Sequence, residues 1–215
     1  MPILSYILTA LAAYLLGSIP TGYLAGRARG IDIRTVGSKN MGATNVFRSV
    51  GKTIGILVLL VDAFKGWAAV CLAAPWVLHF TGVPGAPANA PFVASVIAGI
   101  GAILGHNYTC WLQFKGGKGI ATTAGVMLAL VPWGLGIALA VWIVLFAATR
   151  YVSVASIGAA AVLPFATWFT THSPTLTVIF SALGALAIYK HKANIQRLRA
   201  GTENRISFKK KEPTP

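Results

Sequence analysis

A glycine- and lysine-rich stretch, residues 105–123, holds the residue types best suited to bind an anion. It reads GHNYTCWLQFKGGKGIATT and lies between two long apolar runs. Glycine lets a backbone approach a ligand closely and adopt positive φ, and free N–H groups at the start of a helix attract phosphate. Lys115 and Lys118 add positive charge. The stretch predicts either a phosphate-binding loop that opens a helix or a basic loop that only sets membrane topology.

A second polar segment, residues 36–48, reads VGSKNMGATNVFR. Its Ser, Thr and Asn side chains can hydrogen-bond to hydroxyls and phosphate oxygens, and Lys39 and Arg48 lie near its two ends. A turn followed by a helix N-cap would account for one or two of these polar residues, but it does not need so many. The segment is therefore a second candidate for substrate binding.

A third polar segment, residues 189–203, reads YKHKANIQRLRAGTE. His191, Asn194 and Leu198 share one face of a predicted helix, which we expect to end at Gly201. An anchor for anionic lipid headgroups accounts for the lysines and arginines. It accounts less well for His191, Asn194 and Glu203, so a functional role stays open for these three.

The bulk composition indicates which class of protein carries these polar segments. The chain has 215 residues, of which 56% are hydrophobic and only 10% are charged, whereas soluble domains carry about 25% charged residues. The net charge is +14, and the basic residues lie between apolar runs. This distribution is typical of the positive-inside rule rather than of nucleic-acid binding. We therefore predict an all-α integral membrane protein that does not bind nucleic acid.

The apolar runs predict about seven transmembrane helices, some of them short or broken. The run at residues 120–149 is either one long span or two short spans broken at residues 131–134. Two spans would place Arg150 and the basic tail with the other basic loops, so the charge rule favours the break. The N-terminus is then outside and the C-terminus is cytoplasmic. The remaining spans are expected at residues 3–24 (broken near Pro20), 52–80, 92–106, 151–170 and 173–189.

Two ionisable residues, Asp62 and Lys65, fall inside the second predicted span. They are three residues apart and so share a helical face. Ionisable groups at membrane depth are functional hypotheses by default, but mutual neutralisation is the simpler interpretation, and we favour a structural pair. The three polar segments would face one compartment and form a cationic pocket at the membrane surface, next to a bilayer that suits an acyl chain.

The motifs in these segments resemble those of the bacterial acyl-phosphate:glycerol-3-phosphate acyltransferase family, PlsY. The resemblance runs from about residue 17 to residue 206, with the motifs in the order of the family. Lys39 and Met41 depart from it, because small or aliphatic residues are common there. The matching motifs are GSIPTG (17–22), GSKNMGATN (37–45), DAFKG (62–66), GHN (105–107), FKGGKG (114–119), HKANIQRL (191–198) and GTE (201–203).

The resemblance implies that an acyl group moves from acyl phosphate to the 1-hydroxyl of sn-glycerol 3-phosphate. Phosphate and lysophosphatidic acid would be the products, in the first acylation of bacterial phospholipid synthesis. It implies one domain over residues 1–206, followed by a basic tail at 207–215. The enzyme would lie in the bacterial inner membrane with its active site facing the cytoplasm, among membrane lipid and without cofactor or metal.

The residue content fits that chemistry. Acyl phosphate is already activated, so the enzyme must mainly hold two anions together, orient a hydroxyl and stabilise developing negative charge. The sequence lacks the G-x-S-x-G elbow of serine acyl-enzymes and the H-x-x-x-x-D signature of another acyltransferase class. We expect no covalent intermediate, and a substrate phosphate could act as the base. The alternative is a transporter of a phosphorylated anion, although we see no inverted repeat.

The resemblance also implies roles for individual residues. Ser38 and Arg48, with a lysine of the glycine-rich stretch, would hold glycerol 3-phosphate. The stretch itself would bind the donor phosphate, with help from Thr122. His191 and Asn194 would orient the hydroxyl or support the pocket, while Glu203 would brace the tail. The expected catalytic residues are Ser38, Arg48, Lys118, His191 and Asn194, and the expected substrate-binding residues are Asn40, Gly42, Thr44, Asn45, His106, Asn107, Lys115, Gly116, Gly117, Gly119, Thr122 and Glu203.

Overall fold

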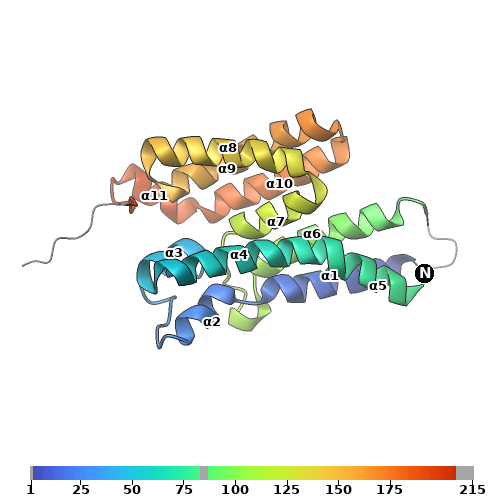
Figure 1. Cartoon of the computed structure of the whole chain (residues 1–215), viewed down its shortest axis with the longest axis horizontal. Helices are drawn as coiled ribbons and strands as arrows, with labels where there is room; N and C mark the ends of the chain where they lie inside the picture. Colours follow the sequence, from blue (N-terminus) through green and yellow to red (C-terminus); the bar gives the residue numbers. More distant parts are fainter. Residues whose placement is uncertain (1, 83–86, 207–215) are drawn as a thin grey trace, which may run out of the picture. The chain divides into compact units, whose positions relative to one another are not determined.

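The computed structural model describes residues 2–82 and 87–206, and these residues are helical and contain no strand (Figure 1). The predicted tail, residues 207–215, lies outside the described residues. The chain divides into two compact units, residues 1–135 and 136–215.

The first unit contains every helix up to α7. The break predicted in the first span is confirmed, because α1 stops at Ser18 and α2 begins at Thr21, with Pro20 as its N-cap. The elements are α1 (Pro2–Ser18), α2 (Thr21–Arg27), α3 (Ala43–Ser49), α4 (Lys52–Ala68), the π-helix η1 (Ala69–Ala73), α5 (Ala74–Thr81), α6 (Ala90–Asn107), the 3₁₀-helix η2 (Cys110–Leu112) and α7 (Ile120–Leu130).

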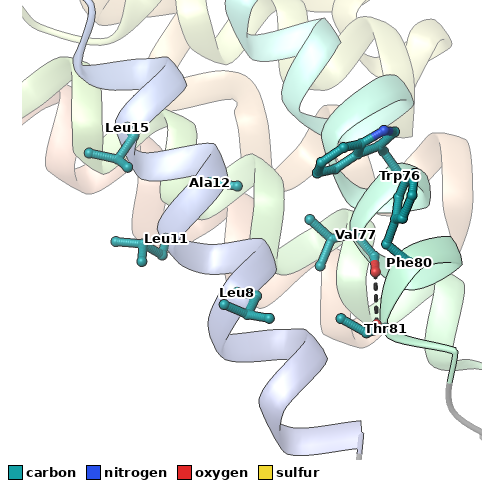
Figure 2. Close-up of a pocket in the computed structure, with 8 residues that line it drawn as sticks. All are labelled: Leu8, Leu11, Ala12, Leu15, Trp76, Val77, Phe80 and Thr81. Carbon is teal, nitrogen blue, oxygen red and sulfur yellow. Dashed lines mark hydrogen bonds between the residues drawn. The ribbon is translucent and has the colours of Figure 1, made fainter.

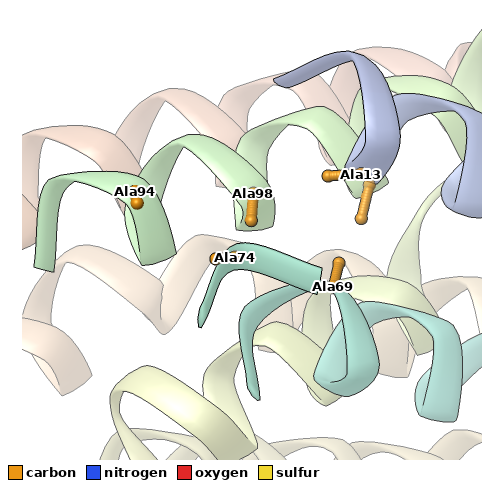
Figure 3. Packing of buried hydrophobic residues seen from close by; sticks show 6 residues of the cluster. Ala13, Ala69, Ala74, Ala94 and Ala98 are labelled. Carbon is orange, nitrogen blue, oxygen red and sulfur yellow. The ribbon is translucent and has the colours of Figure 1, made fainter. Parts of the chain in front are cut away.

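Small residues bring α6 close to α1. Ala13 of α1 packs with Ala94, Ala98 and Ala102 of α6 in a buried cluster that Ala69 and Ala74 complete from η1 and α5 (Figure 3). The approach of the two backbones is so close that a Cβ at Gly17 would collide with the Ala102 carbonyl oxygen. Close backbone approach through small residues is a common way for helices to associate where apolar burial alone gives no selectivity. This packing fixes the position of α6, whose last two residues are His106 and Asn107.

The second unit contains most of α8 (Pro132–Thr149), then α9 (Val152–Thr171), α10 (Pro174–Lys190) and α11 (Lys192–Arg199). Helices α9 and α10 pack closely, since a Cβ at Gly184 would lie 2.6 Å from the Ala160 carbonyl oxygen. Helix α8 joins α9 through Trp142, whose indole N–H donates to the Ser156 hydroxyl at 3.2 Å. The break predicted at residues 131–134 is confirmed, because α7 ends at Leu130 and α8 starts at Pro132.

Within residues 2–82 and 87–206, five helical segments are long and apolar enough to cross a membrane, and two shorter apolar helices accompany them. Many of their large apolar side chains are exposed, and Trp133 reaches 80% exposure. Such surfaces require cover by another apolar phase, which supports the predicted membrane protein. The long segments are Ile3–Arg27, Lys52–Thr81, Ala90–Leu112, Pro132–Thr149 and Val152–Thr171, and the shorter helices are Ile120–Leu130 and Pro174–Lys190.

Candidate active site

The apolar groove between α1 and α5 is not where the polar residues gather. It has a volume of about 300 Å³ and is lined from α1 by leucines and from α5 by Trp76, Val77, Phe80 and Thr81 (Figure 2). Its one hydroxyl, on Thr81, donates to the Val77 carbonyl oxygen at 2.8 Å. A groove with this lining offers no charged partner to an anion, so the candidate site must be built from the polar segments.

The glycine loop, residues 114–119, packs on the C-terminal end of α6. The Gly116 N–H donates to the Asn107 carbonyl oxygen at 3.2 Å, and the Gly117 N–H donates to the His106 carbonyl oxygen at 3.0 Å. These bonds satisfy carbonyls that the last turn of a helix leaves without partners. A Cβ at Gly116 would collide with the backbone of His106 and Asn107, and one at Gly117 with the His106 ring. Gly116 and Gly117 are thus required for packing, whereas the sequence suggested that their amides face an anion.

Positive φ in this stretch occurs at three positions. Gly119, the N-cap of α7, has a φ of 81°, as the sequence analysis expected of a loop glycine. Gln113 and Phe114 also adopt the left-handed region, with φ of 54° and 59°, at a cost of about 1–2 kcal/mol each for residues with a Cβ. Together these three residues turn the chain from α6 back toward α7.

The candidate groups for binding an anion lie at the start of α7. The first backbone bond of this helix runs from the Thr123 N–H to the Gly119 carbonyl oxygen at 2.7 Å, so the amides of residues 120–122 belong to its open first turn. Lys115 is exposed and Lys118 is half-buried. Among the described residues, the Thr122 hydroxyl is buried without a hydrogen-bond partner. Lys118, Gly119 and Thr122 therefore form the candidate anion site.

The segment at residues 36–48 is organised by one side chain, Asn45. Its amide N–H₂ group donates to three carbonyl oxygens, those of Ile33 at 3.1 Å, Val36 at 3.0 Å and Asn40 at 2.9 Å. Its Oδ1 accepts the Ser38 N–H at 2.9 Å. Because Asn45 is 3% exposed and its amide makes these bonds, the side chain shapes the loop that presents Ser38.

The other predicted residues of this segment lie around that loop. Asn40 accepts the N–H of Gly42, the N-cap of α3, at 2.8 Å. Thr44 is half-buried in the first turn of α3, and Arg48 is exposed in its last turn. Met41, which departs from the family pattern, is 3% exposed and packs in an apolar cluster with Ile33, Val46, Val58 and Leu112. The segment is therefore anchored on α4 by an apolar contact.

The Asp62–Lys65 pair predicted in the second span is present, and Thr21 and His106 also lie close to Asp62. Lys65 Nζ lies 2.9 Å from Asp62 Oδ1, and both residues are 2% exposed. The Thr21 hydroxyl donates to the same oxygen at 3.0 Å, and His106 Nδ1 lies 3.6 Å from it. The sequence does not reveal this cluster, because spacing along one helix indicates Lys65 but not partners from α2 and α6. His106, expected to bind substrate, is buried in it.

The predicted residues of the second unit form a separate network around Glu203. Its Oε1 accepts from Asn194 at 2.8 Å and from the Ser153 hydroxyl at 2.9 Å, and its Oε2 pairs with Arg197 at 2.7 Å. The network ties the chain after α11 to α9. Ser153 could not be identified from the sequence, since no motif marks it.

The N-cap of α11 is His191, whose ring Nδ1 lies 2.8 Å from the Ala187 carbonyl oxygen. A carbonyl can only accept, so Nδ1 carries the hydrogen and a neutral ring has its lone pair on Nε2. His191 is 3% exposed and Asn194 is 5% exposed. The structure thus holds both predicted residues in fixed orientations within the second unit.

Two carboxylates outside the apolar spans have lowered pKa values. Burial works against ionisation of Glu203, but hydrogen bonds from Asn194, Arg197 and Ser153 outweigh it and bring its pKa below the ordinary value. The side-chain and backbone hydrogen bonds from Arg34 lower the pKa of Asp32 to about 2. Both acids are therefore ionised at neutral pH.

Comparison with known proteins matches the sequence of this chain to one family. The sequence pattern of the family described as glycerol-3-phosphate acyltransferase matches residues 7–201. A glycerol-3-phosphate acyltransferase of Trichlorobacter lovleyi is 49% identical over 194 residues, which cover 90% of this chain and 94% of the relative. One from Geobacter sulfurreducens is 48% identical over 200 residues and covers 93% of this chain and 96% of its own.

Solved structures agree with these sequences. A crystal structure of PlsY (YgiH), described as an integral membrane glycerol 3-phosphate acyltransferase in its glycerol 3-phosphate form, matches with a TM-score of 0.81 and 36% identity over 94% of this chain and 96% of that chain. The lysophosphatidic acid form matches with a TM-score of 0.79 and 35% identity, with the same coverage. The all-helical membrane fold predicted above is thus supported by a structural relative over nearly its full length.

Proposed function

The chain belongs to the glycerol-3-phosphate acyltransferase family, and we propose that it transfers an acyl group from acyl phosphate to the 1-hydroxyl of sn-glycerol 3-phosphate. The observation that carries the proposal is the match over 94% of this chain to a structure described as the glycerol 3-phosphate form of such an enzyme. The products are lysophosphatidic acid and inorganic phosphate.

The basic residues supply most of what the reaction needs. The hydroxyl oxygen attacks the acyl carbonyl carbon, the bond between this carbon and the phosphate oxygen breaks, and phosphate leaves. Lys118, Gly119 and the first turn of α7 hold the donor phosphate, where the helix dipole and the lysine offset its charge. Arg48 and Ser38 hold glycerol 3-phosphate, since a guanidinium can grip phosphate with two parallel hydrogen bonds. Positioning two anions side by side is the main task.

No protein carboxylate is needed to take the hydroxyl proton. Each of the three acids that the structure describes already has a cationic partner: Asp32 pairs with Arg34 at 2.7 Å, Asp62 with Lys65 at 2.9 Å, and Glu203 with Arg197 at 2.7 Å. We therefore infer that the proton passes to a phosphate oxygen of the bound substrates. The roles that the family resemblance implies for His191 and Asn194, which both lie in the second unit, remain part of the proposal.

The membrane orientation follows from the basic residues. We propose seven crossings with the N-terminus outside, the C-terminus in the cytoplasm and the active site on the cytoplasmic side of a bacterial inner membrane. The segment between α5 and α6 has no charged residue, whereas the α1–α3, α6–α7, α8–α9 and post-α10 segments carry lysine or arginine. Positive charge concentrates on the cytoplasmic side of membrane proteins.

Phosphate release by the purified protein tests the proposal. The protein in detergent is supplied with palmitoyl phosphate, with and without glycerol 3-phosphate, and both phosphate and lysophosphatidic acid are measured. We expect phosphate release that depends on the acceptor, with one lysophosphatidic acid formed for each phosphate. Release without the acceptor would indicate a phosphatase, and the absence of release would exclude this donor. Uptake of glycerol 3-phosphate into proteoliposomes without acylation would instead support a transporter.

A further inference from the structure

The buried cluster around Asp62 in α4 lies outside the residues proposed to bind substrate. Asp62 and Lys65 are each 2% exposed, and burying a charge pair carries a desolvation cost that the attraction between the charges does not always recover. Well-packed apolar residues would serve stability at least as well. Neutralisation alone therefore does not explain why the pair is placed at this point in α4.

Three groups from different parts of the first unit converge on one oxygen, Oδ1 of Asp62. They are Lys65 Nζ at 2.9 Å, the Thr21 hydroxyl at 3.0 Å and His106 Nδ1 at 3.6 Å. Lys65 also donates to the Ile19 carbonyl oxygen at 3.0 Å, at the break between α1 and α2. A single carboxylate thus joins α4 to the start of α2 and to the end of α6.

The α6 branch of this cluster leads to the glycine loop. The side of the His106 ring that carries Nε2 faces Gly117, so closely that a Cβ on Gly117 would collide with this nitrogen. The carbonyl oxygen of His106 accepts the Gly117 N–H at 3.0 Å. The position of the ring, which Asp62 approaches from Nδ1, is therefore coupled to the position of the loop.

The same short stretch of α4 also supports the far end of the loop. A Cβ at Gly66 would collide with the Thr122 carbonyl oxygen, and one at Gly125 with the Ala63 carbonyl oxygen. Helix α4 thus contacts α7, which follows the glycine loop directly, while Asp62 lies near His106 at the end of α6, on the other side of the loop in the chain. Residues 62–66 therefore contact both α6 and α7, the two helices that the glycine loop connects.

The α2 branch leads to the segment that carries Ser38. Thr21 is the first residue of α2, and a Cβ on the next residue, Gly22, would collide with the Met41 carbonyl oxygen and lie 3.2 Å from a Val46 methyl group. Displacement of α2 would therefore move the loop that Asn45 shapes. Asp62 is the point where supports for both polar segments of the first unit meet.

We propose that Asp62 is a positioning residue that holds the glycine loop, through His106, and the Ser38 segment, through Thr21, at a fixed separation for the two phosphorylated substrates. Its kinetic consequences rest on the proposed function, whereas its structural consequences do not. A carboxylate suits this role because one oxygen can accept from both Lys65 and Thr21 while His106 Nδ1 lies 3.6 Å away. Lys65 keeps the cluster neutral and fixes the α1–α2 break.

The test compares Asp62→Asn, His106→Gln and the double variant with the wild type. Asp62→Asn removes the charge, and His106→Gln removes Nδ1 while a side-chain nitrogen remains near the Nε2 position. Acyl transfer is measured at varied concentrations of each substrate. In parallel, trypsin cleavage after Lys115 and Lys118 is timed against cleavage after Arg199 in the second unit. Ser5→Ala is the matched control, since it removes another helix–helix hydrogen bond, the partly buried one from the Ser5 hydroxyl to Thr81 at 2.8 Å.

We expect Asp62→Asn to lower kcat/KM by about 10- to 100-fold, the effect of displacing reacting groups by about 1 Å. Cleavage in the glycine loop should accelerate by about fivefold or more relative to Arg199, as local opening becomes easier. The double variant should lose no more than Asp62→Asn alone, because residues that act through one another are not additive. Ser5→Ala should change neither the kinetics nor the cleavage pattern.

Three results would overturn the inference: unchanged kinetics and cleavage in Asp62→Asn, additive losses in the double variant, or equal losses in Ser5→Ala. If Asp62→Asn does not fold, His106→Gln and the charge-neutral Asp62→Asn/Lys65→Met variant carry the same expectations. A wild type without acyl transfer, combined with faster loop cleavage in the variants, would remove the proposed function and retain the positioning role. An active wild type whose variants show unchanged kinetics and unchanged cleavage would retain the proposed function and remove the positioning role.

Discussion

The carbonyl oxygen of His106 accepts a hydrogen bond from the Gly117 N–H at 3.0 Å, and the imidazole ring of His106 lies against the same glycine. The end of α6 and the glycine loop are therefore one packed unit. The glycines that first suggest backbone contact with a ligand are here required by contact with a neighbouring helix.

Substitution of Gly117 by alanine should destabilise the protein. The new methyl group would overlap the His106 ring, and overpacking of this kind costs about 1–3 kcal/mol. Thermal unfolding should shift to a lower temperature, and acyl transfer should fall with it. Gly136→Ala is the control, because among the described residues nothing lies within 4 Å of a Cβ there. An unchanged melting temperature for Gly117→Ala would contradict the packing described for the loop.

Loss of the Thr122 hydroxyl should weaken binding of acyl phosphate without lowering the stability of the fold. This hydroxyl is buried with no partner among the described residues, so Thr122→Val should leave the melting temperature unchanged or raise it. If the hydroxyl donates to the donor phosphate, KM for acyl phosphate should rise by about tenfold, in line with one lost hydrogen bond to a charged group. Thr167→Val, which removes the equivalent buried hydroxyl in α9, should not affect KM.

Ser38→Ala and Arg48→Ala should each reduce acyl transfer by about 100-fold, the cost of misplacing a reacting group by about 1 Å, because both residues are proposed to position glycerol 3-phosphate. Ser38 is half-buried in a loop held by Asn45, and Arg48 is exposed, so folded protein should be recovered in nearly normal yield. Steady-state kinetics and circular dichroism check the two expectations. Arg29→Ala removes an exposed arginine outside the candidate site. Full activity in both site variants would exclude the assigned roles.

The Glu203 network should make stability depend on pH. Burial opposes ionisation of this carboxyl, but the hydrogen bonds to Asn194, Arg197 and Ser153 lower its pKa in the folded state. The stabilisation is therefore complete above the pKa of the unfolded chain, and it disappears as the pH falls through the lower pKa of the folded protein. Melting temperatures of the wild type and Glu203→Gln should differ at pH 7 and converge in acid. A large loss of kcat with an unchanged melting temperature would instead make Glu203 a base.

Cysteine labelling should report the membrane orientation. In a background with Cys71 and Cys110 replaced by alanine, single cysteines are placed at the exposed positions Arg29, Asn89 and Thr202. A membrane-impermeant maleimide applied to intact cells should label the cysteine at position 89. Those at 29 and 202 should react only after the membrane is opened. Labelling of all three from one side would rule out the proposed crossings.

The sequence alone predicted what depends on local chemistry. Apolar runs indicated a helical membrane protein, and prolines located the breaks that occur before Thr21 and at Pro132, because a proline lacks an N–H and clashes with the preceding turn. The glycine-rich stretch was expected to open a helix, and α7 begins at Ile120. The spacing of Asp62 and Lys65 predicted their pairing. The family resemblance came from motifs in these same segments and was confirmed by the comparisons.

Only the tertiary structure decided what depends on partners distant in the chain. Gly116 and Gly117 contact α6 rather than open space, and His106 joins Asp62 rather than standing alone. Ser153 completes the Glu203 network from α9. Periodicity reports which face of a helix a residue occupies, but not which helix faces it. Whether a polar side chain binds substrate or supports a residue that does is therefore decided by packing, which brings α4, α6 and α7 together around one loop.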